Sequence, residues 1–203
     1  VLEPDDPRIA SALGDLGDVS SELTHYDAAI GYYRRALEVL QKGGAPDPSL
    51  VGSLRVNLAS ALRYKGAIGD ALEELDKART ITERALGPDH PQLATIALDT
   101  GAAELDAGRT SEALVQFQRA RDLFTRALGA DHPNVGTTDF RIGEVELAQG
   151  HVDEAVASFQ HALDIWQAKL GPEHPSLASA LDGLARAQLA RKHPADALAF
   201  YQR

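Results

Sequence analysis

Small and bulky apolar residues recur in a fixed order along the chain, and this order returns every 42 residues. An alanine is followed four positions later by a bulky residue and three positions after that by a second alanine, except in the last copy, where the chain ends first. Steps of four and three keep these side chains on one face of a helix, so the pattern predicts a helix in each copy. The first alanines are Ala29, Ala71, Ala113, Ala155 and Ala197, the bulky residues are Tyr33, Leu75, Phe117, Phe159 and Tyr201, and the second alanines are Ala36, Ala78, Ala120 and Ala162.

Another helix is expected before each of these, with its first turn at Pro7, Ser49, Pro91, Pro133 and Pro175. Proline is tolerated at the first helical position. The residue before it can cap the helix, and Asp6 is a good cap there, whereas His90, His132 and His174 are weaker ones. A small residue stands ten positions after each of these opening residues, and it lets a neighbouring helix approach closely. These small residues are Gly17, Ala59, Gly101, Gly143 and Ala185. Gly66, Gly108 and Gly150 are expected to end these helices in a left-handed conformation, at a place where the outer copies have Thr24 and Lys192.

The connector between copies repeats almost letter for letter. Leu86-Gly87-Pro88-Asp89-His90-Pro91 returns at 128–133 and again at 170–175, and degenerate forms stand at 44–49 and 2–7. A fixed period of this length is typical of a stacked array of helix pairs. We expect one array over 1–203, with units at 7–48, 49–90, 91–132, 133–174 and an incomplete 175–203, after the tail of an earlier unit at 1–6. Both ends cut through a unit, so we expect a piece of a longer protein.

This pattern resembles the tetratricopeptide repeat, and the 42-residue step with its Leu-Gly-Pro-Asp-His-Pro connector is similar to the longer variant of kinesin light chains. The resemblance implies an all-α fold: a right-handed superhelical array of about five antiparallel helix pairs, whose concave groove is lined by the first helices. It also implies a non-catalytic scaffold for proteins or peptides. Bacterial signalling proteins often carry this variant, and an Asn frequently stands on its inner face, where only Asn57 matches here.

Composition narrows the range of partners. The chain of 203 residues has a formal net charge of -10, which disfavours nucleic acid and anionic membrane surfaces as partners. It has no cysteine, no long apolar run and no signal-peptide pattern, so we expect a cytoplasmic protein.

The recurring His90, His132 and His174 stand beside acidic residues and could suggest a ladder of metal sites. Equivalent residues of successive units should lie at least about 8–10 Å apart, whereas zinc ligands share one ion at about 2 Å. We therefore interpret them as cap and connector residues. No catalytic or phosphate-binding motif appears, so we predict no enzyme activity, no metal and no cofactor.

Projecting the units in register gives the expected lining of the groove. The candidate binding residues are Asp15, Asp18, Asn57, Tyr64, Leu98, Asp99, Asp106, Phe140, Arg141, Glu144, Asp182 and Arg186. On the same projected faces, Val56, Leu98 and Phe140 form an apolar strip. Acidic residues outnumber basic ones on these faces, which favours a basic peptide with hydrophobic anchors. The competing interpretation is that the acidic excess only reflects the charge of the whole chain.

A second hypothesis is a structural module for self-association. An array without a polar capping helix exposes an apolar face at its end, and Leu198, Phe200 and Tyr201 are candidates for a contact between copies. The dependence of the measured mass on concentration would separate this homo-oligomer from the peptide-binding scaffold.

Overall fold

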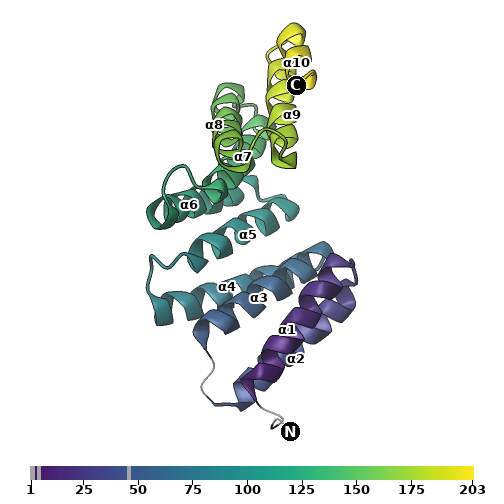
Figure 1. Cartoon of the computed structure of the whole chain (residues 1–203), viewed down its shortest axis with the longest axis vertical. Coiled ribbons are helices and arrows are strands. Elements are labelled where there is room, and N and C mark those ends of the chain that lie inside the picture. Colours follow the sequence, from purple (N-terminus) through teal and green to yellow (C-terminus); the bar gives the residue numbers. More distant parts are fainter. Residues whose placement is uncertain (1–2, 4–5, 45–46) are drawn as a thin grey trace. The chain divides into compact units, whose positions relative to one another are not determined.

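The computed structural model describes residues 3, 6–44 and 47–203, and this part of the chain contains ten α-helices and no strand (Figure 1). The helices are α1 (Pro7–Glu22), α2 (Tyr26–Lys42), α3 (Pro48–Tyr64), α4 (Ile68–Leu86), α5 (Gln92–Asp106), α6 (Thr110–Leu128), α7 (Pro133–Ala148), α8 (Val152–Leu170), α9 (Pro175–Ala190) and α10 (Pro194–Tyr201). The predicted all-α repeat fold of about five helix pairs is confirmed. The expected earlier tail at 1–6 and the connector at 44–49 lie partly outside the described residues.

The chain divides into two compact units, Val1–Arg109 with α1 to α5 and Thr110–Arg203 with α6 to α10. In the first unit, consecutive helices pack on one another, and α3 also contacts α1 and α5. In the second, consecutive helices again pack together, and α7 also contacts α9. The boundary lies within the predicted third repeat at 91–132, and the repeat limits given above stay predictions.

The recurring alanines and bulky residues predicted for the second helix of each copy form three columns of equivalent residues, and these columns form the core of both units. All nine column alanines are at most 1% exposed, and so are Tyr33, Phe117 and Phe159, with Leu75 at 2%. The fifth bulky residue, Tyr201, is 54% exposed and is the exception. Because a buried large apolar side chain contributes about 1.5–3 kcal/mol relative to an exposed one, these columns carry much of the stability of each unit.

The small residues of the first helices lie against the bulky column. A Cβ atom added to Gly17 would lie 2.3 Å from the Tyr33 ring, and one added to Gly143 would lie 2.9 Å from the Phe159 ring. The glycines thus let the two helices of a pair approach until the ring fills the space between them.

The helix ends follow the expected chemistry. Asp6 accepts a hydrogen bond from the Arg8 N–H at 2.9 Å, and the Nδ1 atoms of His132 and His174 accept from backbone N–H groups two residues later at 3.2 Å. Thr24 (φ 61°) and Lys192 (φ 64°) adopt the left-handed conformation of the inner glycine turns. The turn geometry is therefore kept where the sequence has no glycine, and Thr24, which is β-branched, holds it at a cost in backbone strain.

None of the helices in the described ranges has both the length and the apolar character that a membrane span requires.

Candidate protein-binding surface

Asp18 and Asn57, two of the predicted groove residues, meet in the first unit. The Asn57 Nδ2 group donates to Asp18 Oδ1 at 2.9 Å, and the Tyr33 hydroxyl donates to the same oxygen at 2.7 Å. Burial, together with the Asp18 carboxylate, raises the pKa of the Tyr33 hydroxyl, so it stays protonated and keeps donating. This cluster joins α1, α2 and α3, and it holds the Asp18 carboxylate in one orientation at the surface.

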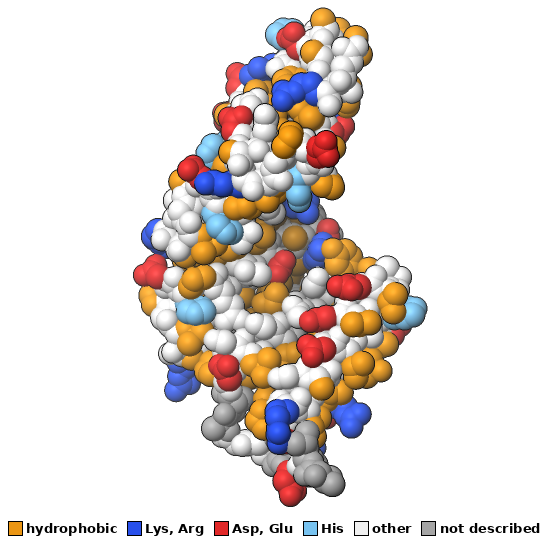
Figure 2. Space-filling view, viewed as in Figure 1, with side chains coloured by type: hydrophobic (Ala, Val, Ile, Leu, Met, Phe, Trp, Pro, Cys, Tyr) orange, Lys and Arg blue, Asp and Glu red, His pale blue; other side chains and the backbone are white. Residues whose placement is uncertain are grey.

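A row of carboxylates runs along one face of α1. Asp15, Asp18 and Glu22 are three and four residues apart, so they share a face, and all three are exposed. Asp15 and Glu22 form no ion pair within the described part of the chain. Figure 2 shows acidic side chains gathered over the region that Figure 1 draws as α1. These carboxylates are available to a cationic partner.

The predicted Asp106 and Tyr64 lie in a cluster of aromatic and charged side chains. Arg63 Nη1 lies 2.8 Å from Asp106 Oδ2, and the Arg63 guanidinium lies 4.5 Å from the centre of the Tyr64 ring. Tyr64 also stacks on Tyr26 with ring centres 5.4 Å apart, and it remains 59% exposed. Asp106 is thus largely neutralised inside the molecule, whereas Tyr64 offers an exposed aromatic surface.

The predicted Asp99 carboxyl on α5 is far less accessible than the α1 row. Burial raises its pKa from 3.8 to about 6, and the positive charge of Arg63 only partly offsets this effect. Near neutral pH a charged carboxylate therefore stands in a poorly solvated position. The neighbouring Leu98 is half-buried, and Val56 of the predicted strip is buried at 7% exposure.

Replacing Asp99 by asparagine should change how stability depends on pH. Between pH 3.8 and about 6 the folded chain keeps a proton that the unfolded chain has released, so the free energy of unfolding should fall as the pH rises. Asp99→Asn should abolish this fall and raise the free energy of unfolding at pH 7 by up to about 3 kcal/mol. Urea unfolding at a series of pH values measures both effects. Asp106→Asn is the control, and parallel curves for wild type and Asp99→Asn would contradict the prediction.

In the second unit the predicted charged residues pair with one another. Arg141 Nη1 lies 2.8 Å from Glu144 Oε2, and Arg186 Nη1 lies 3.7 Å from Asp182 Oδ2. The Tyr201 hydroxyl also lies 3.4 Å from Asp182. The predicted acidic and basic residues of this unit are equal in number, and each acid lies near an arginine of its own helix.

Phe140 belongs as much to the core as to the surface. It is half-buried, and its ring centre lies 5.6 Å from that of Phe159 and 5.7 Å from that of Trp166. We expected this position to point away from the packed interior, and the structure differs because Phe159 and Trp166 of α8 reach it. A substitution at Phe140 would therefore disturb packing as well as any binding.

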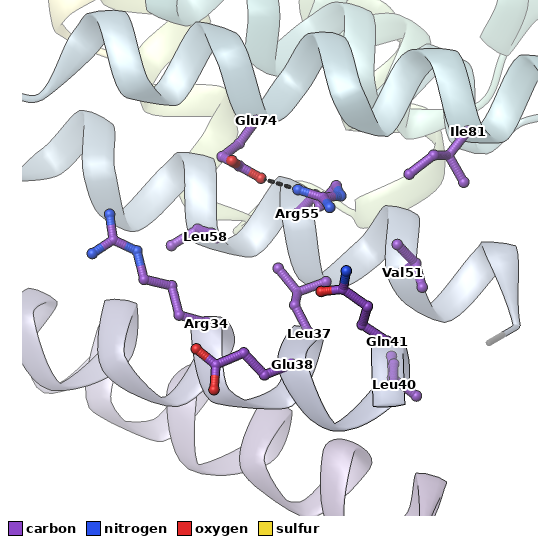
Figure 3. Close-up of a pocket in the computed structure, with 10 residues that line it drawn as sticks. All are labelled: Arg34, Leu37, Glu38, Leu40, Gln41, Val51, Arg55, Leu58, Glu74 and Ile81. Carbon is purple, nitrogen blue, oxygen red and sulfur yellow. Dashed lines mark hydrogen bonds and ion pairs between the residues drawn. The ribbon is translucent and has the colours of Figure 1, made fainter. Parts of the chain in front are cut away.

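The structure also shows polar groups that the groove projection missed. A cavity of about 470 Å³ between α2, α3 and α4 is lined by both apolar and charged side chains (Figure 3). At its centre Arg55 forms an ion pair with Glu74, which also accepts from Lys77 at 2.7 Å. The Arg55 Nε group is buried and has no partner in the described structure. The sequence could have pointed to Arg55, because a charged residue stands there at a position where other units have the apolar residues Leu13, Ala97 and Leu181.

Asp139 is the equivalent residue of the fourth unit, and it is buried at 2% exposure. The Asp139 Oδ2 atom lies 2.6 Å from His161 Nδ1, and Oδ1 lies 3.6 Å from Arg121 Nη1. Both partners are partly exposed, so the carboxylate is compensated from the solvent side of the helices. Within the described residues, no group of three or more His, Asp and Glu side chains could hold a metal ion.

Comparison with solved structures shows the same fold in other proteins. The crystal structure of BtubC (BKLC) from P. vanneervenii is 21% identical, with 97% of this chain and 78% of that chain covered and a TM-score of 0.86. A putative kinesin light chain from Podosopora anserina with nearly identical TPR-like repeats is 20% identical over 100% of this chain and 94% of that chain, with a TM-score of 0.78. A Rap protein complexed with Competence and Sporulation Factor is 14% identical over 94% of this chain and 51% of that chain, with a TM-score of 0.77.

The sequence comparison identifies the family. No curated protein matches the chain. Models of the tetratricopeptide repeat, in contrast, match residues 12–46, 50–126, 101–155 and 134–203, which together span most of its length. The chain therefore belongs to the tetratricopeptide repeat family.

Proposed function

We propose that the chain is a non-catalytic scaffold that binds a basic segment of a protein or peptide along the α1 face of the first unit. The observation that carries this proposal is the row of exposed carboxylates at Asp15, Asp18 and Glu22, two of which have no ion-pair partner in the described structure. A row of like charges without counter-charges attracts and orients a segment of opposite charge.

The charge balance of the remaining predicted residues supports this choice of face. Asp106, Glu144 and Asp182 each lie within 4 Å of an arginine, so they offer little net charge to a partner. Tyr64, which is exposed and stacked on Tyr26, provides an aromatic anchor point in the same unit. The favoured partner is therefore a basic segment with apolar side chains.

The comparisons support a peptide or protein as the partner. The Rap protein of similar fold was solved in complex with Competence and Sporulation Factor, and the family is one of repeat scaffolds. That this chain belongs to a larger bacterial signalling protein stays a prediction from the resemblance.

The test compares two variants with the same loss of charge. Asp15→Asn with Glu22→Gln should weaken binding of a lysine-rich amphipathic peptide by about three- to tenfold, because each exposed charge contributes up to about 1 kcal/mol. Glu112→Gln with Asp122→Asn on α6 is the matched control and should leave the affinity nearly unchanged. Fluorescence anisotropy at several salt concentrations measures the affinity, with a glutamate-rich copy of the peptide as the second ligand.

Two outcomes would overturn the proposal. Equal weakening in both variants would mean that only the net charge of the chain attracts the peptide. Equal affinity for the basic and acidic peptides would mean that the carboxylate row does not select the partner.

A further inference from the structure

The cavity between α2, α3 and α4 contains a charged group that the proposed function does not use. Its volume of about 470 Å³ lies within the range of small-molecule sites (Figure 3). The apolar part of its lining is aliphatic and consists of Leu37, Leu40, Val51, Leu58 and Ile81. The charged part consists of Arg34, Glu38, Arg55 and Glu74. The cavity therefore combines an aliphatic wall with a few charges, as sites for small amphipathic molecules do.

Arg55 uses only one end of its guanidinium group. Its Nη1 atom forms an ion pair with Glu74, and Figure 3 shows this pair on the α4 side of the cavity. Within the described residues the Nε group is buried without a partner, and Nη2 donates no hydrogen bond. Nε and Nη2 together form the edge of a guanidinium that binds a carboxylate through two parallel hydrogen bonds. This edge of Arg55 therefore lacks an acceptor.

The positive charge of Arg55 is only partly balanced inside the chain. Glu74 also accepts from Lys77 Nζ at 2.7 Å, so one carboxylate serves two cations. Glu73 lies 3.7 Å from Lys77 and is 73% exposed, so water screens most of its charge. The Arg55 side chain is 23% exposed and lines the cavity, so the charge that is left over can attract an anion there.

The second unit has an equivalent place in which a buried charge is compensated from two sides. Asp139 of α7 is the residue equivalent to Arg55. It faces Arg121 of α6 and His161 of α8, one partner from each of the second helices beside it. In the first unit only α4 supplies a partner, because Leu37 of α2 stands at the place of Arg121. The acceptor that Arg55 lacks is therefore missing on the α2 side, next to the cavity.

We propose that this cavity binds a small molecule that joins a carboxylate to an aliphatic body. The carboxylate binds the Nε and Nη2 edge of Arg55, and Glu74 keeps Nη1. Nε is covered in this structure, so binding includes a small turn of the flexible Arg55 side chain toward the carboxylate. The aliphatic body lies on Leu37, Leu58 and Ile81.

The ligand thus supplies from the α2 side the acceptor that the chain itself does not provide. A buried donor without a partner destabilises the folded chain, and the bound carboxylate removes this cost. A free alkyl carboxylate and the C-terminal residue of a peptide present the same chemistry. The experiment distinguishes these two sources.

Isothermal titration calorimetry with octanoate tests the proposal. Octanoate should bind at one site per chain, and octylammonium, which has a body of the same length and the opposite charge, should bind at least about tenfold more weakly. The second ligand is an N-acetylated tripeptide that ends in leucine, and its C-terminal amide form is the control. Preference for the free-acid peptide over octanoate would assign a peptide terminus, and the reverse would assign a free alkyl carboxylate.

Two variants remove the site in different ways. Arg55→Gln removes the guanidinium and should weaken octanoate binding at least about tenfold. Leu37→Glu places a carboxylate on the α2 side and should weaken binding to a similar extent, because the chain then supplies its own acceptor. Arg79→Gln on α4 loses the same charge outside the cavity, and Leu37→Met keeps the apolar wall, so both should bind within about twofold of wild type.

The exposed charges at the cavity should act in opposite directions. Arg34 and Glu38 both line it from α2, and neither forms an ion pair in the described part of the chain. Arg34→Gln should weaken octanoate binding about two- to fivefold, and Glu38→Gln should strengthen it by a similar factor. Asp15→Asn with Glu22→Gln should leave it unchanged, because the carboxylate row of α1 is a separate surface.

Four outcomes would overturn the proposal. They are no binding of either octanoate or the leucine peptide at millimolar concentration, equal binding of octanoate and octylammonium, equal weakening by Arg55→Gln and Arg79→Gln, and equal affinity of the Leu37→Glu and Leu37→Met variants. Circular dichroism checks that each variant keeps its helix content. The Leu37 pair keeps the test decisive if Arg55→Gln does not fold.

Discussion

Phe159→Ala should lower the free energy of unfolding by about 3–5 kcal/mol, the range for removing a fully buried phenylalanine ring. The ring is 0% exposed, and it touches the Phe140 ring and fills the space next to Gly143 and Gly183. It therefore packs against α7 and α9 at once, and its loss leaves a cavity that the helix backbones cannot close. Urea unfolding followed by circular dichroism measures the change.

Tyr201→Ala is the matched control for this prediction. Tyr201 occupies the same place in the repeat but is 54% exposed, so its truncation should lower the free energy of unfolding by less than about 1 kcal/mol. The measurement should be made at low protein concentration, so that association between copies does not contribute. Similar losses for both variants would show that burial in the column is not what stabilises the chain.

Removing the partners of Asp139 should have a comparably large effect. With His161→Ala and Arg121→Ala together, a carboxylate that is 2% exposed loses both the ring nitrogen and the guanidinium that face it, which should lower the free energy of unfolding by about 3 kcal/mol. Asp139→Leu should change stability by less than about 1.5 kcal/mol, because a buried ionic group can be replaced by an apolar one of similar volume. Leu13 and Leu181 already stand at this place in other units.

The triple variant completes the comparison. In the Asp139→Leu background, the two alanine substitutions should lower the free energy of unfolding by less than about 1 kcal/mol, since no buried charge remains. Denaturant unfolding at pH 7 provides all the values. If the double substitution costs the same in both backgrounds, His161 and Arg121 stabilise the helices independently of Asp139.

The sequence was sufficient to predict the helices, because each signal recurs at a fixed place. The alanine columns fixed the buried face of the second helices, and the glycine and proline residues fixed the turns. The repeat also predicted that Thr24 and Lys192 occupy the place of the left-handed glycines, although neither residue favours that conformation. A local preference is overruled there by the packing of the two helices that the turn connects.

The charges of the candidate surface were harder to predict, because ion pairs depend on side chains from neighbouring elements. Asp106 counted as an available acid, yet Arg63, from the preceding repeat, neutralises it. The projection treated Asp99 in the same way as Asp106. Burial raises the pKa of Asp99, however, and a periodic pattern does not measure how deeply a side chain is buried. Arg55 and Asp139 stand outside the projected groove faces, at a position of the repeat where the other units have Leu13, Ala97 and Leu181.

In the described part of each unit, the helices that pack closely on one another are next to each other or next but one along the chain. Contacts between residues close in sequence form quickly, because little chain entropy is lost before the first stabilising contact is made. A pair of helices can therefore nucleate folding anywhere within a unit and recruit its neighbours in turn. The 42-residue period that organises the sequence is, in kinetic terms, a series of equivalent starting points for folding.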